Sequence, residues 1–284
     1  MRVKENILLG GYKPPSKYEA LKSKNYSVVI FTPTRDGKCS HSYAISLAHT
    51  CLVLEAANIA VTIGRSTNSC FVDLSRNLFA NEFLSSKHTH MLQIDDDMDW
   101  NPEAVLDLFL FDKEFVAGVG RKKTDDIDFA GVYLEDDNGA PIGQLGRTQE
   151  ETLLKMKYIG GAFTLHKRSV FEKLMTPEDH TKTGYKFYEC RYYFNGWRSE
   201  DYVFCEKCTD KGIDIWCYPN IEMGHLGNKN YSGNYFKFLK ERGEKQGVSK
   251  GSGLTPDQML QRSIDRISKA IEESPIKVEG GINV

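Results

Sequence analysis

The sequence predicts an α/β protein whose central sheet is mainly parallel. Three short, mainly apolar runs, residues 27–31, 59–63 and 90–94, predict strands, and the first has the composition of a buried strand. Two segments with helical apolar periodicity, residues 42–57 and 73–86, separate these runs. Strands that alternate with helices in this way form βαβ units, in which the strands lie parallel in one sheet. With 284 residues, the chain can bury a sizeable core around such a sheet.

The rest of the chain predicts further elements of the same kind. Asn101 and Pro102 suit the cap and the first position of a helix. Strand character returns at residues 114–120, and again at 153–166 around a pair of glycines. The other expected elements are a polar loop region at 121–150, helices at 167–175, 200–211 and 255–273, and a strand at 213–217. We expect one domain over residues 1–228 and a helical extension over 229–284 that packs on it.

Composition and charge favour no particular class of partner, and a local basic patch stays open. The net charge is about −2, so the chain as a whole has no electrostatic attraction for nucleic acid or anionic membrane. Seven cysteines without a framework spacing predict free thiols in a reducing compartment. No apolar stretch has the length of a signal peptide core or a membrane span. These features predict a cytoplasmic protein, with self-association into a homo-oligomer left open.

Four aspartates crowd into five positions directly after the strand at 90–94, in the run IDDDMD. A calcium loop is excluded, because its turn glycine would fall at Trp100 and its bidentate glutamate at Leu106. A nucleophilic aspartate and a plain charged turn both stay open. The favoured hypothesis is a metal site at Asp95 and Asp97, because alternate carboxylates leaving a strand end can bind one Mn²⁺ or Mg²⁺ that bridges two phosphates.

Three later features support a ligand site. Glu200 and Asp201 begin a predicted helix, where the helix dipole favours ionised carboxylates that could serve as a catalytic base. His225 lies between glycines after a predicted strand and could be a further metal ligand. Gly160 and Gly161 would let backbone approach a ligand closely or make a bulge.

These segments together resemble a known family. The order TPTRD, IDDDM, IGGAFTLHK and SEDYVFCEKCTDKGIDIWCYPNIEMGHLG, over residues 27–227, is similar to that of GT-A glycosyltransferases. It looks like the inverting, family-2-like branch, which includes small versions in phages and large viruses. The resemblance implies a Rossmann-like GT-A fold, a viral protein in a host cytoplasm, and transfer of a sugar from a UDP- or GDP-sugar to an acceptor hydroxyl.

The resemblance also implies roles for particular residues. The nucleotide would be bound by Thr32, Pro33, Thr34, Arg35, Arg76, Asp95, Asp96, Gly160, Gly161 and Lys229. The ion would be Mn²⁺ or Mg²⁺, with Asp95, Asp97 and His225 as its ligands. Asp201 would be the catalytic base, and Glu200 and Trp197 would orient the acceptor, which could be a glycan, a protein or a modified nucleobase. Lys229 matches a diphosphate-binding lysine of some retaining relatives only with a shorter spacing, so inversion and retention both stay open.

Two other functions remain as alternatives. A nucleotidyltransferase acting on sugar phosphates would also use clustered carboxylates, but would be expected to show a glycine-rich basic loop near the first strand. A non-catalytic nucleotide- or sugar-binding module would be expected to lack the base or the metal residues. DNA binding through the aromatic and basic stretch NYSGNYFKFLKER is explained more simply by an amphipathic segment.

Overall fold

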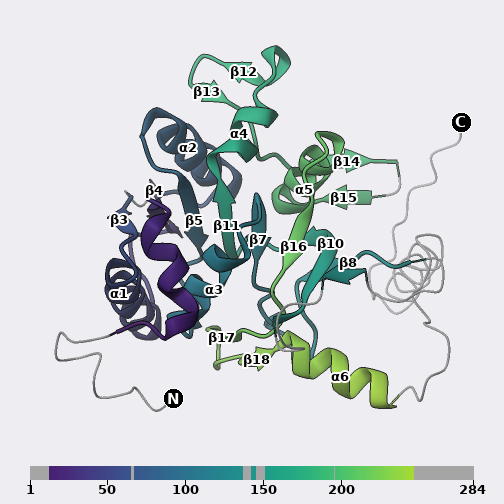
Figure 1. Cartoon of the computed structure of the whole chain (residues 1–284). Coiled ribbons are helices and arrows are strands. Elements are labelled where there is room, and N and C mark those ends of the chain that lie inside the picture. Colours follow the sequence, from purple (N-terminus) through teal and green to yellow (C-terminus); the bar gives the residue numbers. More distant parts are fainter. Residues whose placement is uncertain (1–12, 65–66, 137–141, 145–150, 195, 246–284) are drawn as a thin grey trace, which may run out of the picture.

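A nine-stranded sheet forms the centre of the computed structural model, which describes residues 13–64, 67–136, 142–144, 151–194 and 196–245 (Figure 1). In order across the sheet, its strands are β3 (Ala60–Ile63), β1 (Ser27–Phe31), β5 (His90–Ile94), β11 (Phe163–Lys167), β7 (Phe115–Ala117), β16 (Ile215–Cys217), β10 (Leu153–Ile159) and β8 (Gly131–Tyr133). The ninth strand, β9 (Gly143–Gln144), pairs with β10.

Most of these strands point the same way. The first three, β3, β1 and β5, are parallel, and β7 and β16 are parallel to each other. Only β11 and β10 run against the rest, because each of them pairs antiparallel with its neighbours. The mainly parallel, helix-flanked sheet confirms the predicted fold class.

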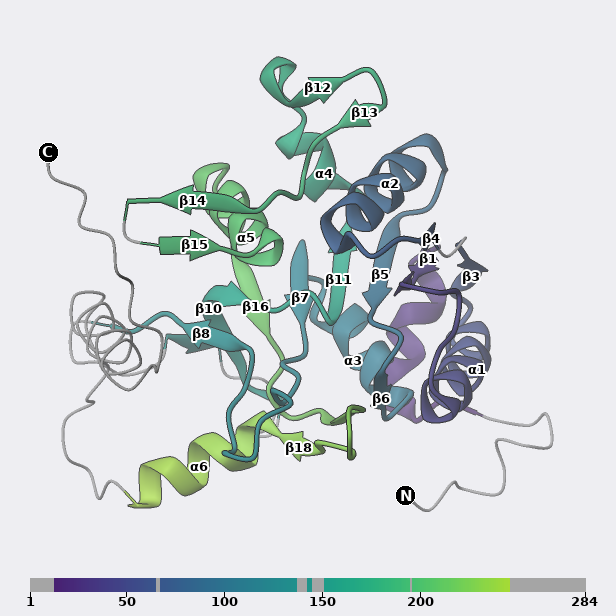
Figure 2. The same ribbon diagram turned by 180° about the vertical axis from the view of Figure 1, so that it is seen from behind.

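Helices cover both faces of the sheet (Figures 1 and 2). On one face, η2 (Ser16–Ser23), α1 (His41–Ala56) and α3 (Glu103–Phe111) form a core with alternate strand residues such as Leu92 and Ile94. On the other face, α2 (Val72–Ser85), α4 (Arg168–Leu174) and α5 (Glu200–Asp210) form a second core with Met91 and Phe115. All five residues of β5 are buried, on one face or the other, and two of them, His90 and Gln93, are polar.

Several shorter elements surround the sheet. The small pairings are β2 (Pro33–Thr34) with β4 (Thr67–Asn68), β12 (His180–Thr181) with β13 (Gly184–Tyr185), β14 (Arg191–Tyr193) with β15 (Gly196–Arg198), and β17 (Glu222–His225) with both β6 (Met98–Trp100) and β18 (Gly233–Asn234). A second 3₁₀ turn, η4 (Pro177–Asp179), precedes β12, and α6 (Tyr235–Lys245) ends the described chain. None of the helices in the described ranges is both long and apolar enough to cross a bilayer.

The structure refines two expectations about the elements. The strand region predicted at 153–166 is two strands, β10 and β11, which pair with different neighbours, and the two glycines lie between them. α3 begins at Glu103, so the cap position is Pro102 and not Asn101 as predicted; the Asn101 side chain, one residue earlier, still accepts a hydrogen bond from the backbone N–H of Glu103 at 3.2 Å. The helix predicted at 255–273 lies outside the described residues.

Candidate functional site

The carboxyl ends of β1 and β5 open into a cleft of about 220 Å³. The two strands are adjacent and parallel, so the segments that follow them meet at one edge of the sheet, where α/β proteins usually bind ligands. The cleft is lined by Pro33, Thr34, Arg35, Ser69, Cys70, Val72, Asp95, Asp96 and Asp97. Six residues of the predicted site therefore lie together here. Thr32 instead hydrogen-bonds the hydroxyl of Tyr43.

Asp97 and His225 come together because β17 pairs with β6, which places His225 opposite Met98. Nε2 of His225 lies 3.3 Å from Oδ1 of Asp97. Nδ1 of His225 lies 2.8 Å from the backbone oxygen of Arg121, which can only accept a hydrogen bond. Nδ1 therefore carries a proton, and Nε2 is the ring nitrogen that faces Asp97. Burial opposes protonation of His225, but the hydrogen bonds to Asp97 and Arg121 outweigh it and raise the pKa of His225.

This pair of atoms suits a divalent cation. Apart from its contact with His225, the buried Oδ1 of Asp97 has no hydrogen-bond partner within the described part of the chain. Two ligands that each lie about 2.1 Å from an octahedral ion are about 3 Å apart, close to the observed separation. A backbone carbonyl on the second ring nitrogen is also the usual support of a metal-binding histidine.

The rest of the expected metal site is arranged differently. Oδ2 of Asp97 accepts a hydrogen bond from the ammonium group of Lys123, a residue that the sequence analysis did not single out. The carboxylate of Asp95 bonds to Arg76 rather than to the Asp97–His225 pair. Among the residues that the structure describes, no group of three or more His, Cys, Asp or Glu side chains converges as a metal site would.

Arg76 links the aspartates to the start of α5. Its guanidinium is 3% exposed, and it donates to Glu200 at 2.6 Å and to Asp95 at 3.1 Å. Gly161 makes this position possible, because a Cβ there would lie 2.3 Å from a guanidinium nitrogen of Arg76. Arg76 was predicted to contact the nucleotide, and the structure places it behind the cleft as the cation between two carboxylates.

Asp201 is held by backbone at the other end of this link. Its Oδ2 accepts from the N–H of Gly161 at 3.2 Å, and its Oδ1 accepts from the N–H of Tyr202 at 2.8 Å. The hydroxyl of Ser199 also donates to Oδ1. Gly160 lies beside the same carboxylate, so both predicted glycines belong to this group.

Two predicted residues lie apart from these groups. Trp197, on β15, is 52% exposed. Lys229 forms an exposed ion pair with Asp125 at 2.7 Å. Within the described residues, neither side chain forms a hydrogen bond or an ion pair with the aspartates of the cleft. The roles expected for Trp197 and Lys229 therefore stay predictions.

The carboxylates of the run IDDDMD differ in their protonation. Burial, together with the neighbouring charges of Asp97 and Asp95, raises the pKa of Asp96 to about 6. Burial also opposes ionisation of Asp97, but hydrogen bonds from His225 and Lys123 outweigh it and lower the pKa of Asp97. Cations beside Asp97 therefore resolve much of the repulsion expected from the crowded aspartates.

Sequence reasoning missed four residues that contribute to this region. Ser69, Cys70 and Val72 line the cleft from the segment that leads into and begins α2, and nothing in their types signals a site. Lys123 lies in the basic run Arg121–Lys122–Lys123, which was visible only as part of a polar loop. Its positive charge, opposite to that of the aspartates, is the signal that could have identified it.

Comparisons with known proteins give distant likenesses of fold. Neither protein-family models nor curated protein sequences match this chain. Similar solved structures include A197 from STIV, with 16% identity and a TM-score of 0.46 over 74% of this chain and 91% of that chain. GalNAc-T7 with UDP, GalNAc and Mn²⁺ has 12% identity and a TM-score of 0.39, over 88% of this chain and 58% of that one. The inositol-1-phosphate CTP transferase from T. maritima has 12% identity and a TM-score of 0.35, over 79% and 98%.

Proposed function

We propose that the protein is a metal-dependent glycosyltransferase that moves a sugar from a UDP- or GDP-sugar to an acceptor hydroxyl. The observation that carries this proposal is the chain of contacts from Asp95 through Arg76 to Glu200. It joins a cleft of carboxylates at the strand ends to the start of α5, where Asp201 is held. A donor site and a general base are the two parts that such a transfer requires.

The donor would lie in the cleft. The nucleotide would contact the segment 33–35 and Asp96, and its diphosphate would lie near Asp97. Asp97 and His225 would hold Mn²⁺ or Mg²⁺, with Asp95 as a further or water-mediated ligand, and the ion would neutralise charge on the departing diphosphate. The contact of Oδ1 of Asp97 with Nε2 of His225, whose Nδ1 is held by a backbone carbonyl, supports this assignment.

Asp201 would act as the general base. A carboxylate oxygen would take the proton of the acceptor hydroxyl as that oxygen attacks the anomeric carbon, while the bond from this carbon to the diphosphate oxygen breaks. The three hydrogen bonds to Asp201 fix its orientation. Attack from the face opposite the diphosphate would invert the anomeric configuration.

The first test measures metal-dependent turnover of donors. Wild-type protein should hydrolyse or transfer from a UDP- or GDP-sugar with Mn²⁺, and Asp97→Asn should lower the rate at least about 100-fold. Asp99→Asn is the matched control, because Asp99 instead accepts a hydrogen bond from Asn230. Equal rates for wild type and Asp97→Asn would refute the metal role, and pyrophosphate released from a nucleoside triphosphate and a sugar phosphate would favour a nucleotidyltransferase.

A second test separates donor binding from transfer. Asp201→Asn should bind the nucleotide sugar as tightly as wild type and lose transfer by about 100-fold or more, because the amide cannot accept the proton. Asp210→Asn, at the far end of the same helix, should leave both unchanged. Normal transfer by Asp201→Asn would exclude Asp201 as the base.

A further inference from the structure

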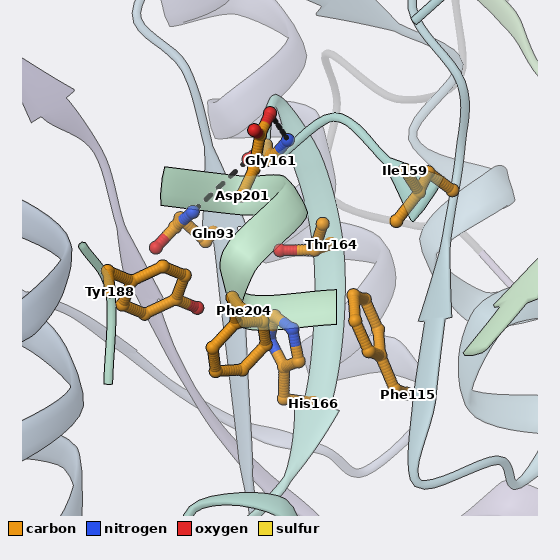
Figure 3. A pocket seen from close by; sticks show the side chains of 9 residues that line it. All are labelled: Gln93, Phe115, Ile159, Gly161, Thr164, His166, Tyr188, Asp201 and Phe204. Carbon is orange, nitrogen blue, oxygen red and sulfur yellow. Dashed lines mark hydrogen bonds between the residues drawn. The ribbon is translucent and has the colours of Figure 1, made fainter. Parts of the chain in front are cut away.

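A small internal cavity lies beneath the Gly161–Asp201 contact (Figure 3). Its volume is about 10 Å³, which is roughly the space that one water molecule requires. The lining residues are Gln93, Phe115, Ile159, Gly161, Thr164, His166, Tyr188, Asp201 and Phe204. The cavity is distinct from the donor cleft, and the proposed reaction assigns it no role.

Polar atoms without partners are concentrated in this cavity. Within the described residues, Oε1 of Gln93, Oγ1 of Thr164, both ring nitrogens of His166 and the hydroxyl of Tyr188 have no hydrogen-bond partner. Each of these four side chains is no more than 2% exposed. A buried polar atom without a partner costs about 1–3 kcal/mol, so five of them in one place indicate a bound polar molecule.

Strand register explains why these side chains meet. Thr164 and His166 are two residues apart on β11 and therefore point to the same face of the sheet. Gln93 lies opposite Thr164 on β5, and Phe115 lies opposite His166 on β7. All of them face the second core, where an apolar side chain would be expected at each position.

Tyr188 closes the cavity from outside the sheet. Its backbone is fixed by Asn77 on α2, whose side chain accepts from the N–H of Tyr188 at 2.9 Å and donates to its carbonyl at 2.7 Å. The ring of Tyr188 stacks on Phe204 of α5, with centroids 4.2 Å apart. The hydroxyl is therefore held in place among aromatic rings that offer it no acceptor.

We propose that this cavity binds one water molecule, and that the hydrated cluster of Gln93, Thr164, His166 and Tyr188 positions Gly161 and, through it, the carboxylate of Asp201. The water can donate to Oε1 of Gln93 and to the bare nitrogen of His166. It can accept from the hydroxyls of Thr164 and Tyr188, because a water on the bare nitrogen of His166 is out of reach of the N–H on the other side of the same ring. The assignment of one donor and one acceptor to the His166 ring is consistent with its burial. Burial lowers the pKa of His166 to about 3 and keeps the ring neutral, with one N–H and one bare nitrogen.

Gln93 connects the polar cluster of the cavity to Asp201, the proposed base, through Gly161. Its amide nitrogen donates to the carbonyl of Gly161 at 3.1 Å, and the N–H of Gly161 donates to Asp201 at 3.2 Å. A water on Oε1 would fix which end of the Gln93 amide faces Gly161. The catalytic consequence rests on the proposed function, whereas the water and its structural effect do not.

The test compares crystal structures of wild type, Tyr188→Phe and Thr164→Val, with Tyr26→Phe as the control. Tyr26 also donates a hydrogen bond, to Asp112 at 2.9 Å, but lies outside the cavity. Wild type and Tyr26→Phe should show an ordered water within hydrogen-bond distance of His166 and Gln93. The two cavity variants should lose or displace this water, and the Gly161 amide should exchange its hydrogen at least about tenfold faster in them than in wild type.

Activity provides a second readout. Tyr188→Phe should lower kcat about tenfold with the KM for the nucleotide sugar unchanged, a split that general destabilisation would not produce. A dry cavity in wild type, or unchanged Gly161 exchange in both variants, would overturn the proposal. An ordered water with unchanged kcat would overturn the positioning role, and a chain without transferase activity would still be judged by the water and the exchange rate.

Discussion

Lys123 places an ammonium group on the carboxylate that is proposed to bind metal. A divalent cation at Asp97 would have to displace Lys123 from Oδ2 or bind beside it, and both carry an electrostatic cost. We therefore expect Lys123→Met to bind Mn²⁺ about five- to tenfold more tightly than wild type in the absence of a donor, as calorimetry or the electron paramagnetic resonance signal of free Mn²⁺ would measure.

Lys122→Met is the matched control for this prediction. Lys122 is the adjacent residue and forms its own ion pair with Asp128, where both side chains are largely exposed. It should leave Mn²⁺ affinity within about twofold of wild type, because an exposed pair contributes little. Weaker or unchanged binding by Lys123→Met would show that Lys123 does not oppose the metal.

Individual residues show how far the sequence could predict the site. Asp97 and His225 were identifiable, because carboxylate and imidazole are metal-binding groups and both follow predicted strands. Their contact depends on the register of β17 against β6, which residue types do not reveal. The pairing of Arg76 with Glu200 spans 124 positions, so it too required the tertiary structure.

At the scale of elements, β6 connects α1 to the proposed metal ligands, because it is hydrogen-bonded to both α1 and β17. The indole nitrogen of Trp100 donates to Oγ1 of Thr50 on α1 at 2.8 Å, and Ser46 accepts from the backbone of Trp100. Because β6 also pairs with β17, these contacts hold His225 beside Asp97.

Thr50→Val tests this connection. The substitution leaves the buried indole N–H without its acceptor, which should lower the free energy of unfolding by about 1–3 kcal/mol and weaken Mn²⁺ binding. Urea denaturation and a Mn²⁺ titration measure the two effects. Thr50→Ser keeps the hydroxyl and should retain wild-type metal affinity; the same affinity in Thr50→Val would mean that β6 does not depend on this bond.

The bounds of the longer helices and of β5 were predictable, although the buried faces of the helices differ from the expected apolar stripes: α1 buries Ser46 and Thr50, and Leu74 of α2 is exposed. Helices expected at 42–57 and 73–86 were found at 41–56 and 72–85, and the strand at 90–94 has the expected bounds. The antiparallel insertion of β11 between β5 and β7 was not predictable, since local apolar character carries no information about strand direction. The two-residue pairings, such as β12 with β13, are too short for any periodicity to appear.

At the scale of the whole molecule, the sheet separates two cores, and each contains buried polar side chains. Ser46, Thr50 and His90 lie on the side of α1 and α3, and Gln93, Thr164 and His166 lie on the side of α2, α4 and α5. The proposed base and its supporting cluster both lie on the second side. Chain segments beyond the predicted boundary at 228 also contribute to it, since Tyr235 of α6 is buried there.

The buried histidine His90 predicts how stability of the whole fold depends on pH. It begins β5, packs between the rings of Tyr26 and Phe109, and lies 2.8 Å from the hydroxyl of Thr89. Burial, helped by the charge of Lys167 and opposed by that of Asp112, lowers the pKa of His90 to about 4. The unfolded chain has an ordinary histidine pKa of about 6.5, so between these values it binds more protons than the folded chain.

Stability should therefore fall as the pH decreases from about 6.5 to 4, and His90 alone should account for about 3 kcal/mol of the loss by pH 4. Urea denaturation at a series of pH values measures this loss of stability.

Because other groups titrate in the same range, the informative quantity is the difference in stability between wild type and His90→Gln, which cannot take up the proton. That variant should lose less stability between pH 6.5 and 4, whatever its stability at neutral pH. His180→Gln, at an exposed site on β12, should follow the wild-type curve. Parallel curves for wild type and His90→Gln would show that His90 is not held neutral by the fold.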